Sequence, residues 1–286
     1  IQVYIPIGSI HEKEGEYGIS HFLEHLKFNR SKKYNTKTLR NKLGNYNYNA
    51  YTTLDHTSYY ITADNKSQKE LIELIKEVVF NTKFTKNEIE IERNIILAEK
   101  LYTKQEKFIL GDISIYDKKN PYHRAVIGET KDIKKLTNKK FRKYNEQYLN
   151  KYFVFISCPE KDIRKVKKEC LKRFPDSLNK IEKPLENVEL YNYELVVRNL
   201  VDDKQLLIIN LKSYNGSDKD TNYLEIFDNI MSKGKLSKLK YVLREQKGMV
   251  YRIESINHNF KDNGFYTIKL ILKKEENIGK VIKLIL

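Results

Sequence analysis

Residues 21–25 read His21-Phe22-Leu23-Glu24-His25, a stretch with three side chains that can take part in metal chemistry. On a helix each residue turns by about 100°, so His21 and His25 share one face and Glu24 lies beside them. Two imidazoles on one face can bind one zinc ion, and a catalytic zinc site has three protein ligands and one open position for water. A carboxylate next to that water can accept its proton. Glu24 is therefore the candidate general base, in an order that reverses the common H-E-x-x-H.

The residues around the motif predict the helix that this chemistry needs. An apolar stripe with helical spacing is formed by Ile19, Phe22, Leu23 and Leu26. Gly18 and Ser20 can serve the N-terminal turn, so we expect a helix over residues 17–29. For the five residues alone, two surface histidines beside a glutamate remain an alternative interpretation.

A second predicted helix carries two further carboxylates. It begins near Thr85, which has Glu88 three residues later in a capping-box pattern, and it continues past Glu99. Glu92 and Glu99 lie two helical turns apart and share a face. Glu99 would complete a set of two histidines and one glutamate around zinc, and Glu92 would orient one of the imidazoles. Two glutamates on a helix that simply face solvent are the alternative.

Composition limits the class of protein. Hydrophobic residues make up 40% of the 286 residues and charged residues 32%, which is typical of a globular protein, and no apolar run approaches the roughly 20 residues of a membrane span. The net charge is +16, but the basic residues are mixed with acidic ones and no nucleic-acid-binding motif is present, so we expect no nucleic-acid partner.

In 161–173 the lysines surround an apolar stripe of Ile163, Val166, Cys170 and Phe174, which predicts the solvated face of a packed helix. The two cysteines are too few for a disulfide framework, and we expect both in the core.

Periodicity and turn residues predict the remaining elements. We expect a strand at 1–8, a short helix at 36–43 closed by Gly44, a hairpin of 49–53 and 56–62, a helix at 67–79, a helix at 133–149, a strand at 152–156, strands at 195–201 and 205–211, and helices at 219–231 and 278–286. The strand at Ile1 is already under way and the last helix has no stop signal, so we expect the natural product to extend beyond these residues. The compartment cannot be inferred from the sequence.

Three segments together resemble the pitrilysin family of zinc peptidases, which includes insulin-degrading enzyme and the mitochondrial processing peptidase. They are residues 18–28, 49–52 (Asn49-Ala50-Tyr51-Thr52) and 92–99 (ERNIILAE). Glu99 lies 74 residues after His25, about where the family places its third ligand. The resemblance implies a zinc metalloendopeptidase that acts on peptides or unfolded proteins. It would hold one zinc ion per active chain on His21, His25 and Glu99, with Glu24 as the base.

The resemblance also implies a fold. We expect an α/β (α+β) protein of two similar lobes, each a mixed, mostly antiparallel sheet with helices packed on it. The first lobe would cover residues 1–183 and carry the zinc site. The second would cover 184–286 and be incomplete. Residues 174–190 contain Pro175 and Pro184 and few apolar side chains, as expected of the boundary.

Further residues acquire roles only through the resemblance. Arg244 and Tyr251, seven residues apart, match a pair that reaches the zinc site from the facing half of family members, where they could donate hydrogen bonds to an oxyanion. Residues 49–52 match the strand edge that binds substrate. The visible half implies a homodimer or a heterodimer with a related chain. Other family members keep the fold as catalytically silent scaffold subunits, which is the alternative function.

Overall fold

The computed structural model divides the chain into two compact units. Unit 1 comprises Ile1–Tyr102 and Arg124–Glu182, and unit 2 comprises Thr103–His123 and Lys183–Leu286. The structure describes residues 1–64, 67–105, 115–116, 120–176, 190–200, 203–261, 263–274 and 277–285. The predicted boundary between 183 and 184 lies outside the described residues, so the extents of the two lobes stay a prediction.

Unit 1 contains a four-stranded sheet in the order β2-β3-β1-β4. Its strands are β1 (Gln2–Ile5), β2 (Asn47–Thr52), β3 (Thr57–Thr62) and β4 (Phe153–Phe155). Every pair is antiparallel. The predicted hairpin of β2 and β3 is confirmed, and β2 lies at one edge of the sheet.

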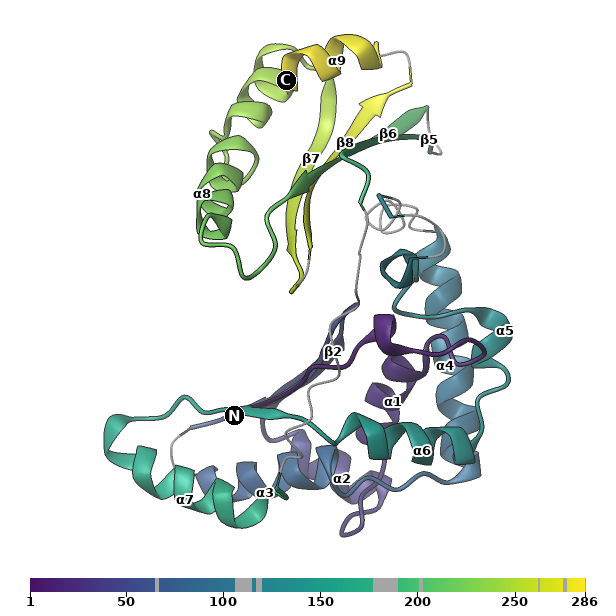
Figure 1. Cartoon of the computed structure of the whole chain (residues 1–286), viewed down its shortest axis with the longest axis vertical. Helices are drawn as coiled ribbons and strands as arrows, with labels where there is room; N and C mark the ends of the chain where they lie inside the picture. Colours follow the sequence, from purple (N-terminus) through teal and green to yellow (C-terminus); the bar gives the residue numbers. More distant parts are fainter. Residues whose placement is uncertain are drawn as a thin grey trace. The chain divides into compact units, whose positions relative to one another are not determined.

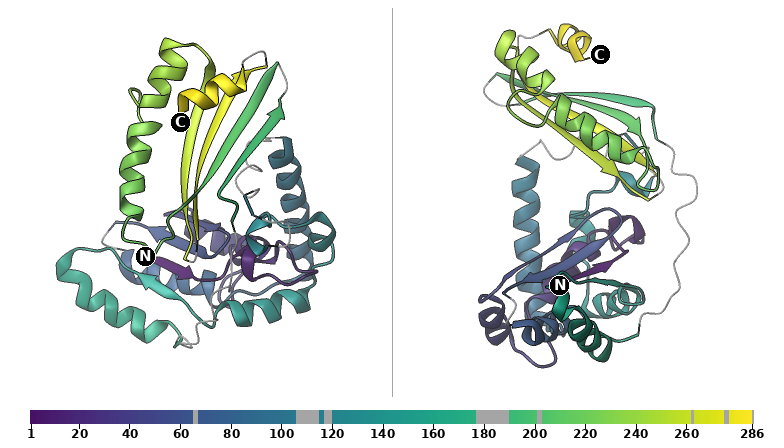
Figure 2. Two further views of the ribbon diagram at one scale, coloured as in Figure 1. Left: turned by 45° about the horizontal axis from the view of Figure 1, so that its top comes forward. Right: turned by 90° about the vertical axis from the view of Figure 1, so that its left-hand side faces the viewer.

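Helices cover this sheet and close the core of unit 1. They are α1 (Ile19–Lys27), α2 (Thr36–Leu43), α3 (Gln68–Val79), α4 (Lys86–Gln105), α5 (Thr130–Ile133), α6 (Asn138–Tyr148) and α7 (Ile163–Arg173), with short 3-10 turns at Ser9–His11 and Glu160–Asp162. A third 3-10 turn, Pro121–His123, belongs to unit 2, as do the last three residues of α4. Figures 1 and 2 show α3, α6 and α7 on the same side of the sheet. Val3 of the sheet and Phe22 of α1 are fully buried in one core with Phe141 of α6. The apolar residues that alternate along the strands and those that recur with helical spacing in α1 therefore pack together in one apolar layer.

The predicted helix at 133–149 is wrong in one respect, because it is two helices. α5 ends at Ile133, and α6 begins at Asn138 after Thr137, whose hydroxyl accepts a hydrogen bond from the amide of Lys140. A threonine cap of this kind starts a new helix rather than continuing an old one.

Unit 2 repeats the plan with a second antiparallel sheet, in the order β5-β6-β8-β7. Its elements are β5 (Tyr193–Asn199), β6 (Lys204–Ser213), α8 (Thr221–Met231), a π-helix (Lys240–Gln246), β7 (Val250–Asn259), β8 (Gly264–Lys273) and α9 (Ile278–Ile285). Leu207 of β6 and Leu270 of β8 pack with Leu243 and Val281 in the core. The predicted fold class, helices packed on a sheet in each of two parts, is confirmed, and both sheets are antiparallel throughout their described strands.

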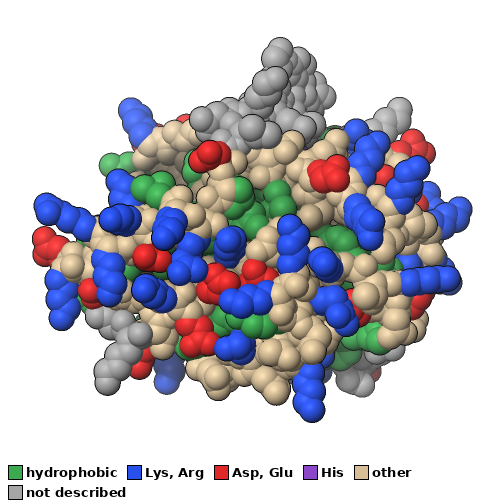
Figure 3. Space-filling model, turned by 90° about the horizontal axis from the view of Figure 1, so that it is seen from below, with side chains coloured by type: hydrophobic (Ala, Val, Ile, Leu, Met, Phe, Trp, Pro, Cys, Tyr) green, Lys and Arg blue, Asp and Glu red, His purple; other side chains and the backbone are tan. Residues whose placement is uncertain are grey.

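Charged side chains are distributed over the surface of unit 1. Figure 3 shows one face on which Lys and Arg are spread broadly with Asp and Glu among them. On α7, Val166 and Cys170 are buried and the lysines are exposed, as predicted, but Ile163 is 49% exposed and lies outside the stripe. None of the helices in the described part of the chain is long and apolar enough to span a bilayer.

Candidate metal centre

Helix α1 carries the sequence motif, and buried contacts fix its start. Gly18 precedes the helix with φ of 97°, in the left-handed region that favours glycine, and a Cβ there would lie 2.7 Å from the carbonyl oxygen of Ile127. The carboxylate of buried Glu12 accepts hydrogen bonds from the amides of Gly18 (2.7 Å) and Ser20 (2.9 Å). Burial raises the pKa of Glu12 to about 7, although the two amide bonds oppose this shift. Glu12 therefore caps the motif helix from outside it.

The opposite end of α1 is tied to two other helices. Lys27 is fully buried, and its Nζ donates to the carbonyl oxygen of Val79 and to Oδ1 of Asn145, each at 2.6 Å. The predicted apolar stripe is buried as expected, at Ile19, Phe22, Leu23 and Leu26. These contacts leave the face of α1 that carries the histidines with little freedom to shift.

Helix α4 begins with the predicted capping box. The amide of Thr85 donates to Glu88 Oε2 at 3.1 Å, and the amide of Glu88 donates to Thr85 Oγ1 at 3.2 Å. Further along, Arg93 Nη2 donates to the carbonyl oxygen of Leu136 at 2.7 Å. The helix is thus fixed on both sides of Glu92, so its carboxylates have a defined position.

The two helices bring three candidate ligands together. His21 Nε2 lies 3.8 Å from Glu99 Oε1, and His25 Nε2 lies 3.8 Å from Glu99 Oε2. One ligand atom from each residue lies within 4.8 Å of the others. These separations are too long for hydrogen bonds and lie near the roughly 3.3 Å between neighbouring ligand atoms of a tetrahedral zinc with bonds of about 2.0–2.1 Å. The donor set of two imidazoles and one carboxylate therefore fits zinc.

Charge and burial act differently on the two histidines. Burial, helped by the nearby His25, lowers the pKa of His21 to about 3, which keeps this imidazole neutral. Burial also acts to lower the pKa of His25, but the hydrogen bond to Glu92 and the charges of Glu24, Glu92 and Glu99 outweigh it and raise that pKa. Metal binding requires the neutral imidazole, so a cation between the two rings would compete with the proton on His25.

Glu92 contacts His25, and its predicted role of orienting the imidazole stays a prediction. Its Oε2 accepts a hydrogen bond from His25 Nδ1 at 3.3 Å, which leaves Nε2 directed at Glu99. Sequence reasoning missed two partners of this carboxylate: Asn29 Nδ2 donates to Oε1 at 2.9 Å, and Arg40 Nη2 lies 3.7 Å from it. Only the position of Asn29, one helical turn after His25, could have indicated its place.

Glu24 is 9% exposed. Helical spacing places it on the side of α1 that carries His21 and His25. Its Oε2 accepts a hydrogen bond of 2.7 Å from Thr52 Oγ1 on β2. Burial raises the pKa of Glu24, aided by the charge of Glu99 and opposed by the Thr52 bond and by His25. A carboxyl group whose pKa is raised is a better proton acceptor than one in water.

The predicted substrate strand is the edge strand β2. Ala50 is buried against the interior, Thr52 is half-buried, and Asn49 and Tyr51 are exposed. The alternation places Ala50 and Thr52 on the side of the helices and the other two on the outer face. The structure thus brings Thr52 to Glu24 and leaves the rest of 49–52 along the edge.

Arg244 and Tyr251 belong to unit 2. Arg244 lies on the π-helix and is exposed, with Nε 3.8 Å from Glu245 Oε1. Tyr251 lies on β7 and is 69% exposed, with Lys204 Nζ 5.6 Å from its ring centroid. Both side chains are accessible, and their approach to a zinc site stays a prediction.

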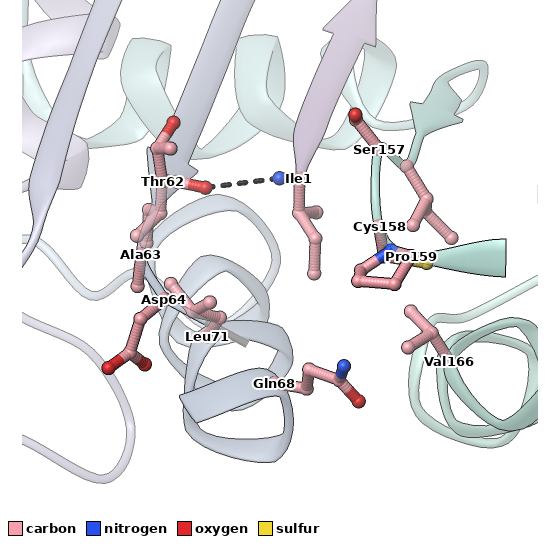
Figure 4. A pocket seen from close by; sticks show the side chains of 12 residues that line it. Ile1, Thr62, Ala63, Asp64, Gln68, Leu71, Ser157, Cys158, Pro159 and Val166 are labelled. Carbon is pink, nitrogen blue, oxygen red and sulfur yellow. Dashed lines mark hydrogen bonds between the residues drawn. The ribbon is translucent and has the colours of Figure 1, made fainter. Parts of the chain in front are cut away.

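A small pocket of about 120 Å³ in unit 1 is separate from this chemistry. It is lined by Ile1, Leu71, Cys158 and Val166 among others (Figure 4). The amino group of Ile1 beside it donates to the carbonyl oxygen of Ile61. Cys158 is half-buried here and Cys170 is buried, so the expectation of two core cysteines is correct only for Cys170.

Two family models match the chain. Residues 1–111 match the family model described as insulinase (peptidase family M16), and residues 133–286 match the model described as the peptidase M16 inactive domain. The chain belongs to peptidase family M16. All the candidate zinc ligands lie in the first match, and Arg244 and Tyr251 lie in the second.

Individual M16 relatives span more than this chain. A protein of Rickettsia bellii named as a zinc protease is 27% identical over 278 residues, which cover 94% of this chain and 66% of that protein. The zinc protease YmxG of Bacillus subtilis is 25% identical over 94% of this chain and 67% of its own length. The beta subunit of the human mitochondrial-processing peptidase is 30% identical over 144 residues, 49% of this chain and 29% of that subunit.

Solved structures show the same fold. A protease from Helicobacter pylori has a TM-score of 0.82 and 22% identity, and the match covers 99% of this chain and 72% of that one. Pitrilysin has a TM-score of 0.71 and 18% identity, with 99% of this chain and 32% of that one covered. The chain therefore corresponds to about a third of pitrilysin.

Proposed function

We propose that this M16 chain is a zinc metalloendopeptidase that hydrolyses peptides or small unfolded proteins. The observation that carries the proposal is the convergence of His21, His25 and Glu99 within 4.8 Å, with buried Glu24 on the same helix. In this proposal His21, His25 and Glu99 hold one zinc ion. The zinc would supply Lewis-acid chemistry, polarising the scissile carbonyl and lowering the pKa of water.

The chain's own residues would handle the proton and the imidazoles. Glu24 accepts a proton from the attacking water and later passes it to the leaving amine. Glu92 holds the ring of His25 through Nδ1 and so keeps Nε2 in place. Arg244 and Tyr251 would donate hydrogen bonds to the oxyanion, supplied from a second half of the assembled protein.

The edge strand β2 would bind the substrate. An extended peptide can add to a sheet edge through main-chain hydrogen bonds, a mode that depends on backbone more than on side chains. Asn49 Oδ1 currently accepts the amide of Ala50 at 2.9 Å, so a peptide carbonyl that pairs there must displace this side chain. We expect broad specificity as a result.

The assembly we propose is a homodimer, with a heterodimer of related chains as the alternative. The chain carries both the zinc ligands and the pair Arg244 and Tyr251, so two copies could complete each other's sites. Closed two-fold pairing is the commonest oligomer form.

Metal analysis and peptide hydrolysis test the function together. The purified protein should contain one zinc per chain and hydrolyse unstructured peptides, and a chelator should abolish hydrolysis. Glu24→Gln should retain zinc and lose activity, because the ligands remain and the base is gone. Glu14→Gln, at an exposed position, is the matched control.

Two outcomes would contradict the proposal. Loss of zinc in Glu24→Gln would show that Glu24 is a ligand and not the base. If the assembled protein contained a full complement of zinc and hydrolysed no peptide, the scaffold function would be favoured. That function remains the alternative because residues 133–286 match a model described as an inactive domain.

A further inference from the structure

We propose that Thr52 is a positioning residue that links the peptide-binding edge to the general base. Its main chain faces the open edge of β2, where a substrate would pair, while its side chain holds Glu24. The inference rests on the proposed function and adds to it the role of one hydroxyl group.

Backbone pairing shows which way the main chain of Thr52 points. In the hairpin, the amide of Thr53 donates to the carbonyl oxygen of His56 at 2.8 Å, so residue 53 faces β3. Successive residues of an antiparallel strand alternate between facing the partner and facing away. Ala50 and Thr52 therefore present their amides and carbonyls to the outer edge. The amide of Ala50 agrees, because it bonds to the Asn49 side chain.

That edge is open in the described part of unit 1. β2 is the terminal strand of the order β2-β3-β1-β4 and pairs there with β3 alone. A peptide that adds to β2 would thus form hydrogen bonds with the main chain of Thr52 itself.

The side chain of Thr52 points the other way, into the unit. Its Oγ1 donates to Glu24 Oε2 at 2.7 Å, and Glu24 is 9% exposed. A threonine hydroxyl has one proton to donate, and a β-branched side chain has few accessible χ1 rotamers. The bond therefore fixes one oxygen of the carboxylate and leaves Oε1 for water.

A single residue in both roles sets the distance between peptide backbone and base. A displacement of about 1 Å at a reacting group can cost about 100-fold in rate. Because the two roles use different atoms, they can be separated. Thr52→Val keeps the main chain and removes the hydroxyl, so peptide binding should persist while proton transfer slows.

The kinetic test compares three variants of the zinc-loaded protein. Thr52→Val should lower kcat about 10-fold or more, with KM within about 2-fold of the parent and zinc content unchanged. Thr52→Ser restores the hydroxyl and should recover kcat to within about 3-fold. Thr62→Val, an exposed threonine on the same hairpin, should change neither constant. A rise in KM with kcat unchanged in Thr52→Val would assign the hydroxyl to peptide binding and overturn the inference.

A second test does not depend on activity. Urea unfolding of the zinc-free protein is measured for Thr52→Val, Glu24→Ala and the double variant. Thr52→Val should raise the unfolding equilibrium constant about 10-fold when Glu24 is present and less than about 3-fold in the Glu24→Ala background. Equal factors would show that the two side chains do not interact, which overturns the Thr52 inference alone. Failure of the assembled, zinc-loaded parent to hydrolyse peptides would instead overturn the proposed function, and the positioning role with it.

Discussion

The external cap of helix α1 makes a prediction about stability that can be worked out from the structure. Glu12→Ala removes the acceptor of two buried amides, those of Gly18 and Ser20. Each buried amide left without a partner costs about 1–3 kcal/mol, so the two together cost about 2–6 kcal/mol. Water entering the vacated space would replace part of this, and we expect a loss of about 3 kcal/mol in the free energy of unfolding.

Urea unfolding of the whole chain, followed by circular dichroism in the presence of a chelator, measures this loss. Glu12→Gln keeps the shape but has one carbonyl oxygen to offer, so it should lose about half as much. Glu14→Ala, exposed in the same loop, is the control and should stay within about 0.5 kcal/mol of the parent. A Glu12→Ala protein that matches this control would refute the capping role. Zinc affinity should fall with Glu12→Ala as well, because both histidines lie on the helix that loses its cap.

Other consequences can be measured separately. Zinc at 100 times its dissociation constant should raise the free energy of unfolding of the parent by about 2.7 kcal/mol and should have no such effect on His25→Ala. An equal effect on both proteins would show that His25 is not a zinc ligand. Mixing Glu24→Gln with Tyr251→Phe chains should recover activity if a homodimer shares its sites, and failure despite subunit exchange would exclude sharing. Proline at Thr52, whose amide faces the open edge, should raise KM and leave zinc content intact; an unchanged KM would indicate another edge. Burial lowers the pKa of His258 to about 4, so between about pH 6.5 and 4 the unfolded chain binds the proton first. The contribution of His258 to the free energy of unfolding should therefore fall by up to about 2 kcal/mol from pH 7 to pH 5, and the difference in thermal midpoint between His258→Phe and the parent, compared at the two pH values, measures this contribution.

The local part of the site could be predicted from the sequence. His21, Glu24 and His25 lie within one helical turn or so, and the periodicity of their neighbours was sufficient to predict the helix. The capping box of Thr85 and Glu88 likewise involves near neighbours. Glu99 was different, because spacing placed it only on a helix. The need for a third zinc ligand made it a candidate, and the family resemblance favoured that role over a solvent-facing glutamate.

The rest of the site could not be predicted because it joins residues from separate elements. Glu12 caps α1 across a loop, and Thr52 reaches Glu24 from a strand 28 residues away. Nothing in local spacing indicates either contact. Periodicity also placed Ile163 on a buried stripe, yet it is 49% exposed, because a residue at the margin of a helical face is buried only when a neighbouring element covers it.

The open edge of β2 also has a consequence for solubility. A strand that must accept extended peptides is equally able to accept an extended segment of another copy, so the feature that would bind substrate is a route to aggregation. Two features oppose it: the Asn49 side chain occupies the amide of Ala50, and the net charge of +16 makes copies repel one another. Since salt screens that repulsion, concentrated preparations should self-associate more readily as ionic strength rises.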